Sequence, residues 1–148
     1  MPEWQWTRRN DRWIGSFGGR RAELILQPTF RSRDVEVPGL WSISKERVPD
    51  LVLRVDSTDR TRLVVLDAKY RASRSNILDA MESAHIYQDS LRIGSRRPDA
   101  TLLLLPAGGG AKWLEDPAFQ SEHRVGVQVI SPQTEIELPR PITEALGA

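Results

Sequence analysis

The 148-residue sequence contains no cysteine, and histidine occurs only as His85 and His123. The lack of cysteine excludes disulfide bonds and thiolate metal sites, and two distant histidines do not suggest a zinc site. Any bound metal would therefore be held by oxygen ligands, which favours magnesium or manganese. No run of about 18 apolar residues is present, so no transmembrane helix is expected. The first residues lack the apolar core of a secretion signal, and we expect a cytoplasmic protein.

The composition is that of one ordinary globular domain, with 39% hydrophobic and 28% charged residues. We expect a single domain over residues 1–148, with an unassigned N-terminal segment at 1–20 and a C-terminal tail at 132–148. The net charge is only +1, yet 18 of the 21 basic residues are arginine. Arginine binds phosphate as a planar fork, which is typical of nucleic-acid contact, but a GC-rich genome explains the excess equally well.

Alternating and continuous apolar runs predict the secondary structure. One helix is expected at 76–93, between a capping Ser75 or Asn76 and Gly94. A short helix is expected from Pro141, and a loop at 31–39. Strands are expected at 21–27, 40–44, 50–56, 61–70, 100–106 and 124–131. This order predicts a mixed α/β fold, with a central mixed sheet and a helical crossover.

The clearest strands form a hairpin that brings two carboxylates together. If its turn centres on Thr58-Asp59, paired residue numbers sum to 117 and Asp50 lies opposite Asp67. Side chains paired in this way have Cβ atoms about 5 Å apart, and two like charges there repel unless a cation lies between them. Lys69, two residues beyond Asp67, projects from the same face. A strand-end ion pair beside a proline turn is the alternative, although Asp67 ends the apolar run 63–66, where a charge is least expected.

These residue types suit phosphodiester hydrolysis. Asp50 and Asp67, with the carbonyl of Ala68, would hold a divalent cation that activates a water molecule. Lys69 would orient that water and stabilise the developing negative charge. A slip of one residue in the register would move the facing side chains to opposite faces and remove the pair.

Three more polar residues are candidates. Gln88 lies within the apolar face of the expected helix, where it either contacts a catalytic pocket or is partly exposed at the edge of that face. Glu23 would be a third carboxylate if its strand lies beside the hairpin; an exposed strand residue is the alternative. His85 would contact phosphate or substrate, or be a solvated histidine. The segment Gly108–Lys112 does not have P-loop spacing and is expected to be a turn.

The string Pro49-Asp50, followed by LVVLDAKYR at 63–71 and HIYQDSLR at 85–92, resembles the PD-(D/E)XK nuclease superfamily. The closest likeness is to McrC-like and other restriction-associated nuclease domains, over about residues 20–131. The resemblance implies a restriction-endonuclease-like αβββαβ core and Mg²⁺-dependent DNA cleavage, with Mn²⁺ as a substitute. It assigns Asp50 and Asp67 as metal ligands and Lys69 as the catalytic lysine. It also draws attention to Tyr70, Arg71 and Tyr87 as substrate-binding residues, beside Glu23, His85 and Gln88.

The expected partners follow from that resemblance. DNA is the expected substrate, with RNA not excluded, and a motor or target-recognition subunit is expected elsewhere. Cutting both strands of a duplex would suggest a homodimer. Two other classes of function stay open: a non-catalytic nucleic-acid-binding module on the same fold, and an assembly domain that contacts a partner through Trp4, Trp6 and Trp13.

Overall fold

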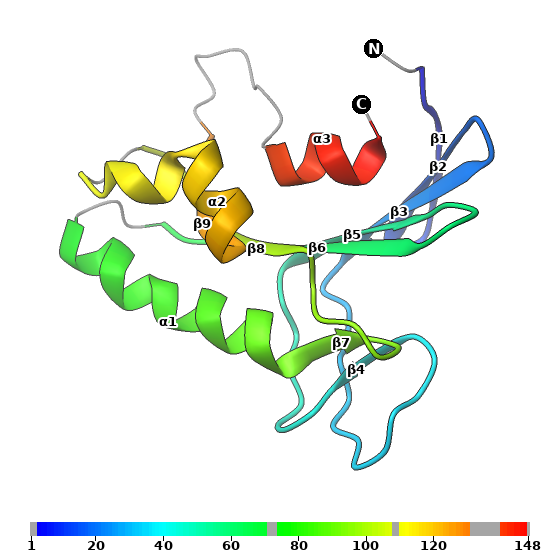
Figure 1. The fold of residues 1–148 in the computed structure, drawn as a ribbon, viewed down its shortest axis with the longest axis horizontal. Helices are drawn as coiled ribbons and strands as arrows, with labels where there is room; N and C mark the ends of the chain where they lie inside the picture. Colours follow the sequence, from blue (N-terminus) through cyan, green and yellow to red (C-terminus); the bar gives the residue numbers. More distant parts are fainter. Residues whose placement is uncertain (1–2, 71–73, 108–109, 131–139, 148) are drawn as a thin grey trace.

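The computed structural model describes residues 3–70, 74–107, 110–130 and 140–147. Strands and helices alternate only in the second half of the chain (Figure 1). The strands are β1 Gln5–Arg9, β2 Arg12–Phe17, β3 Arg20–Leu26, β4 Leu40–Ser42, β5 Leu51–Asp56, β6 Thr61–Ala68, β7 Leu91–Ile93, β8 Ala100–Leu105 and β9 Val125–Val129. The helices are α1 Arg74–Ser90, the 3₁₀ helix η1 Lys112–Glu115, α2 Pro117–His123 and α3 Arg140–Leu146.

Seven strands form one mixed sheet in the order β1-β2-β3-β5-β6-β8-β9. Neighbours from β1 to β6 are antiparallel, whereas β6, β8 and β9 are parallel. The parallel pair β6 and β8 is joined through α1 and β7, because parallel strands need a long crossover. The expected mixed α/β fold with a helical crossover is therefore confirmed.

The sheet is covered on both faces, and this explains its continuous apolar runs. Leu63 and Val65 of β6 face a cluster that includes Phe30 and Leu91, while Val64 and Leu66 face a cluster that includes α3. Figure 1 shows α1 on one side of the sheet and α3 on the other. Since β6 lies at the centre, a charged side chain on its inner face is buried together with the core.

The chain leaves α1 earlier than expected. The helix ends at Ser90, and Leu91–Ile93 pairs with Leu40–Ser42 as a second, two-stranded sheet. Predicting helix to residue 93 was wrong because the apolar residues Leu91 and Ile93 suit both a helix face and a strand. The small sheet packs under the main sheet and closes the cluster next to α1.

Residues 1–20 contain the β1–β2 hairpin, which the sequence pattern did not predict. Asn10 adopts a left-handed φ of 53° at its tip, and Gly18 and Gly19 do so at the next turn. Among the described residues, strands rather than a helix precede β3, so the first helix of the implied αβββαβ core is not found. Helix α2 was also not predicted, although Asp116 caps it and Pro117 begins it. None of the described helices combines the length and apolar character needed to cross a membrane.

Candidate active site

The hairpin has the register that brings the two aspartates opposite one another. Leu51 pairs with Leu66 and Asp56 pairs with Thr61, so the paired numbers sum to 117. Asp50 immediately precedes Leu51, and Asp67 immediately follows Leu66, so the two aspartates continue the same register. Ser57 and Arg60 close the turn with a backbone hydrogen bond of 3.0 Å. The expected pairing of Asp50 with Asp67 therefore rests on a confirmed strand register.

Asp67 is a buried acid, with 5% of its surface exposed. The Nζ atom of Lys69 lies 2.8 Å from its Oδ2 atom. That oxygen nevertheless receives no well-directed hydrogen bond from the described residues, so the contact is an ion pair with poor hydrogen-bond geometry. Asp50 is half-buried, and its Oδ2 accepts a hydrogen bond of 2.8 Å from the backbone N–H of Ala68. The end of the hairpin thus joins both carboxyl groups and the lysine.

Burial sets the protonation of this group. Removal from water raises the pKa of Asp67 above its ordinary value, Lys69 opposes the rise, and the nearby Asp50 carboxylate adds to it. The ammonium does not fully compensate for desolvation, so the raised pKa remains. A carboxyl in this state gains from any further positive charge placed beside it.

A divalent cation fits these residues. The donors are two facing carboxylates, and one oxygen of Asp67 is buried without a hydrogen-bond partner among the described residues; magnesium and manganese prefer such oxygen ligands. Within the described ranges no three histidine, cysteine, aspartate or glutamate side chains group as a metal site. The remaining ligands would therefore be backbone carbonyl, water or phosphate oxygens, which suits magnesium because it keeps several waters. The role of the Ala68 carbonyl stays a prediction.

Two further side chains lie near the pair. Tyr87, on α1, is half-buried against the Phe30 cluster. Burial raises its pKa, and the charge of Asp67 raises it further, so its hydroxyl stays protonated at neutral pH. The charge of Arg47 also acts on Tyr87, and the buried Nε of Arg47 has no hydrogen-bond partner among the residues that the structure describes.

Arg47 was missed by sequence reasoning. Its backbone pairs with Phe30 through hydrogen bonds of 2.8 and 3.1 Å, three residues before Asp50. The residue numbers of the pair Phe30 and Arg47 sum to 77, as do those of Leu26 and Leu51, the last pair of β3 with β5. The bridge therefore continues the β3–β5 register beyond Pro28 and Pro49. No short motif marks such a residue; only the pairing of two distant segments reveals it.

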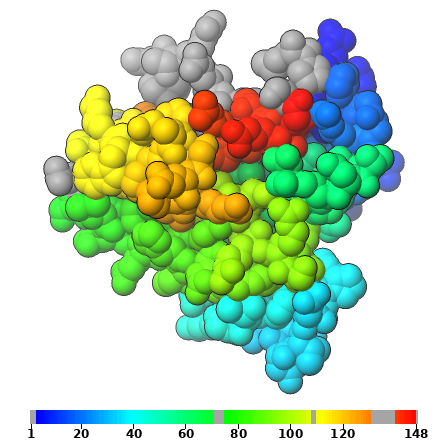
Figure 2. All heavy atoms as spheres, in the orientation of Figure 1, coloured from blue at the N-terminus to red at the C-terminus, as the bar shows by residue number. Residues whose placement is uncertain are grey.

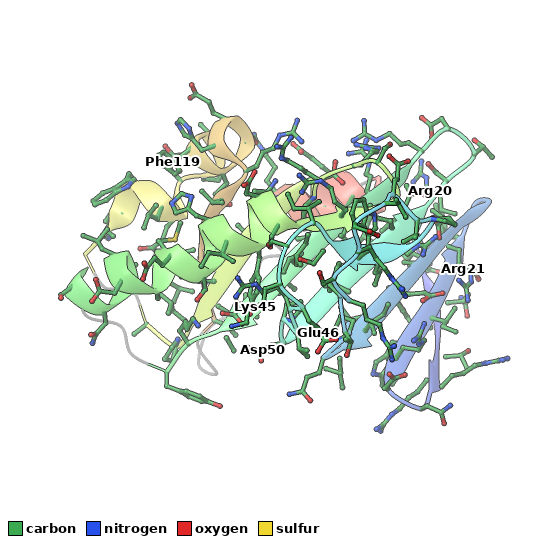
Figure 3. All side chains as sticks on the ribbon, turned by 90° about the horizontal axis from the view of Figure 1, so that it is seen from below. Arg20, Arg21, Lys45, Glu46, Asp50 and Phe119 are labelled. Carbon is green, nitrogen blue, oxygen red and sulfur yellow. The ribbon has the colours of Figure 1, made fainter. Side chains whose placement is uncertain are left out.

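Glu23 is not brought to the pair, although β3 does lie beside β5. It pairs with Arg54, four residues along β5 from Asp50, which corresponds to about 13 Å. Its carboxylate forms ion pairs with Arg12, at 2.9 Å, and with Arg21. Figure 3 shows Arg21 and Asp50 well apart. The expectation of a third carboxylate in the site is therefore corrected, since the register places Glu23 too far along the strand.

Gln88 is likewise directed elsewhere. Its Nε2 donates to the carbonyl of Pro98 at 2.7 Å, and its Oε1 accepts from the hydroxyl of Thr101 at 3.0 Å. No hydrogen bond among the described residues joins it to Asp50, Asp67 or Lys69. The side-chain amide of Gln88 is therefore satisfied by Pro98 and by Thr101 of β8, and its hydrogen bonds hold the fold together rather than the carboxylate pair.

The other candidates lie on the surface or outside the described residues. His85 is exposed on α1, and Tyr70 is 95% exposed just after Lys69. Arg71 lies outside the described residues. Trp6 and Trp13 are 40% and 42% exposed, while Trp4 packs against Trp6 at 5.8 Å between ring centroids.

One comparison with known proteins decides the family. The family model of the PD-(D/E)XK nuclease superfamily matches residues 8–107, which are 100 of the 148 residues and include Asp50, Asp67 and Lys69. The chain belongs to the PD-(D/E)XK nuclease superfamily. Members of this superfamily generally depend on divalent metal ions, in agreement with the donor set at the end of the hairpin. The closer likeness to McrC-like domains stays a prediction. No curated protein and no solved structure matches the chain.

Proposed function

We propose that this PD-(D/E)XK protein is a metal-dependent nuclease that hydrolyses phosphodiester bonds of DNA. The observation that carries the proposal is the buried Asp67, opposite Asp50 and 2.8 Å from Lys69, within the part of the chain that the superfamily model matches. A buried acid with a raised pKa beside a second acid is costly to folding and is typical of a catalytic site.

The residues divide the chemistry as follows. Asp50 and Asp67 would hold a divalent cation, which supplies polarisation of the phosphate and a lower pKa for the attacking water. Lys69 would donate hydrogen bonds from its ammonium to the attacking water and to the phosphate oxygens on which negative charge develops. The protonated hydroxyl of Tyr87 and the guanidinium of Arg47 supply donors for the phosphate oxygens. Among these, Lys69 is held by its backbone, whose N–H donates to Leu104 at 2.9 Å.

The biological setting is proposed on the same basis. A nuclease of this kind acts in phage defence or DNA processing in the cytoplasm. A motor or target-recognition subunit and a homodimer are the proposed partners. Their support is the resemblance of the motifs to restriction-associated domains.

The test is cleavage of a panel of DNA and RNA substrates with Mg²⁺, with Mn²⁺ and with chelator. Asp67→Ala and Lys69→Ala are compared with the parent, and Asp79→Ala, an exposed carboxyl on α1, is the control. We expect metal-dependent DNA cleavage that falls by at least about a hundredfold in both site variants, the usual scale for a general acid–base or charge-stabilising group. Equal cleavage by the parent and both variants would contradict the proposal.

A second candidate is a non-catalytic nucleic-acid-binding module. It is favoured by the ion pair of Lys69 with Asp67, which neutralises the acid without a metal. This module would bind DNA equally well in chelator and would not cleave it. Titration of the folded parent and of Asp67→Ala with Mn²⁺ separates the two, since only the nuclease requires Asp67 for metal binding.

A further inference from the structure

A group of arginines lies away from the carboxylate pair. Arg96, Arg97 and Arg124, together with Gln88, line a hollow of about 390 Å³. No acidic side chain of the described residues lines it. A second hollow of about 200 Å³ shares Arg124 and is lined by Arg60, Arg62, Asp99, Gln120, Ser121, Arg124, Pro141 and Glu144. We call Arg60, Arg62, Arg96, Arg97 and Arg124 the arginine face.

The arginine face occupies one side of the molecule. It is formed by the β5–β6 turn, the start of β6, the segment before β8 and the residue between α2 and β9. Figure 2 shows the β5–β6 turn, the segment before β8 and α2 on the viewed face of the molecule. Arg62 is the second residue of β6 and Asp67 the seventh. Five residues of a strand span about 16 Å, so the arginine face lies at the opposite end of β6 from the carboxylate pair.

The arginine face carries more arginines than its acidic side chains can neutralise through ion pairs. Asp99 serves two arginines, since its Oδ1 lies 3.1 Å from Arg60 and 3.4 Å from Arg96. Arg97 pairs with Asp89 at 3.3 Å, and both side chains are exposed. In the part of the chain that the structure describes, Arg62 and Arg124 form no ion pair and no side-chain hydrogen bond.

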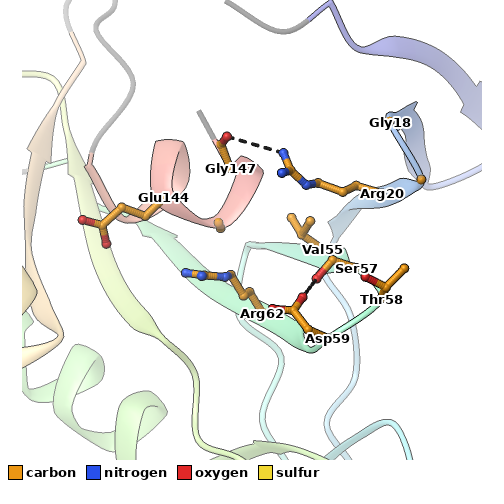
Figure 4. A pocket seen from close by; sticks show the side chains of 11 residues that line it. Gly18, Arg20, Val55, Ser57, Thr58, Asp59, Arg62, Glu144 and Gly147 are labelled. Carbon is orange, nitrogen blue, oxygen red and sulfur yellow. Dashed lines mark hydrogen bonds between the residues drawn. The ribbon is translucent and has the colours of Figure 1, made fainter.

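Arg62 is placed to receive a ligand. It extends between the β5–β6 turn and α3, near Asp59 and Glu144, without a hydrogen bond to the residues drawn in Figure 4. Asp59 accepts a hydrogen bond of 2.6 Å from Ser57. Its charge interacts with that of Arg62, but no hydrogen bond among the described residues joins the two side chains.

Arg124 provides an independent observation. It follows α2 with a left-handed φ of 60°, a position at helix ends that favours glycine or asparagine. The side chain has no partner among the described residues that would explain an arginine in a strained conformation. What the arginine adds is a cation shared by the two hollows. Strain of this kind clusters at functional sites.

We infer that the arginine face binds the phosphodiester backbone of a nucleic acid, as a second contact remote from the carboxylate pair. Planar guanidinium forks match phosphate oxygens, and two adjacent hollows that share Arg124 suit neighbouring phosphates. Among the described residues, the two linings contain one proline and no aromatic or branched aliphatic side chain. An acidic protein partner would need such anchors for a stable interface. The choice of nucleic acid rests on the proposed function.

The experiment uses the full chain and a fluorescein-labelled 20-nucleotide DNA, as single strand and duplex, in chelator. Affinity is measured by anisotropy between 50 and 200 mM salt for the parent and for the double variant Arg62→Gln/Arg124→Gly. The matched control is Arg8→Gln/Arg9→Gln, which removes two exposed arginines from the edge strand β1. We expect the double variant to bind at least about tenfold more weakly, with a salt slope reduced by about two, because each phosphate contact contributes about one.

Folding is controlled by the design, since glycine at position 124 relieves the left-handed strain and should leave the melting temperature equal or higher. An unchanged affinity and salt slope in the folded double variant would overturn the inference. So would an equal loss in the control. If the double variant shows the expected loss of salt slope but the parent cleaves nothing, the arginine face is supported and the proposed nuclease activity fails. If the parent cleaves DNA but the salt slope of the double variant is unchanged, the nuclease is supported and the arginine face fails.

Discussion

At the scale of single residues, the central feature is a charge placed where folding disfavours it. Asp67 is buried on the inner face of the central strand, and burial together with Asp50 raises its pKa. A group with a raised pKa in the folded state binds more protons than it does in the unfolded chain. In the metal-free protein, Asp67 therefore lowers stability as pH rises from the ordinary aspartate pKa of about 4 through the folded value.

Replacing this acid by its neutral isostere should stabilise the metal-free protein. Asp67→Asn removes the cost of the buried charge, so the melting temperature at pH 7 in chelator should rise by about 2–4 °C, the shift expected for about 1 kcal/mol in a domain of this size. The advantage should vanish below about pH 4, where the parent is also neutral. Thermal melts from pH 3 to 8, with Asp79→Asn as the exposed control, measure this. A lower melting temperature for Asp67→Asn at pH 7 would mean that the pair with Lys69 outweighs desolvation.

At the scale of elements, α1 packs on the sheet through Ile77, Met81 and Ala84, and one amide adds a polar contact. Gln88 joins the helix to the carbonyl of Pro98 and to the hydroxyl of Thr101, which is fully buried on β8. The same helix carries Tyr87 toward the carboxylate pair. Tyr87 itself packs against the cluster that contains Phe30 and Leu91, and the contact of Gln88 lies at the next residue of the helix.

Loss of this contact should destabilise the fold. Gln88→Leu leaves a buried hydroxyl and a carbonyl without their partner, which costs about 1–3 kcal/mol. Urea denaturation of Gln88→Leu, Thr101→Val and the double variant gives a double-mutant cycle, and residues in contact couple by about 0.5–3 kcal/mol. A coupling energy near zero would show that the two side chains act independently, contrary to the hydrogen bond between them.

At the scale of the whole molecule, metal and fold are linked. A cation that binds only the folded chain stabilises it by about 1.4 kcal/mol when its concentration is ten times the dissociation constant. The site residues come from both strands of the central hairpin. Metal binding should therefore raise the free energy of global unfolding, and not only that of opening a single loop.

Divalent metal should therefore raise the melting temperature of the parent. In 10 mM Mg²⁺ or 1 mM Mn²⁺ we expect a rise of about 2–5 °C, with no rise for Asp67→Asn. Sodium at matched ionic strength serves as the control for screening. An equal rise in both proteins would place the metal elsewhere.

The sequence by itself determined the local framework. Alternating and continuous apolar runs predicted β3, β5, β6 and β8, because burial of a strand face leaves a period of two or a continuous run. The turn at Thr58-Asp59 then set the register, and with it the pairing of Asp50 with Asp67 and the direction of Lys69. The β1–β2 hairpin, α2 and the exact end of α1 were not predictable, because their short and polar segments fit several structures.

Only the tertiary structure decided which distant residues meet. Glu23 shares a face of the sheet with Asp50 but pairs with a residue four positions further along β5. Gln88 forms hydrogen bonds with Pro98 and Thr101 instead of with the carboxylate pair. Arg47 reaches the neighbourhood of Tyr87 because the β3–β5 ladder continues past two prolines. Local patterns fix which face a side chain takes, whereas the packing of segments far apart in the sequence fixes which side chains come into contact.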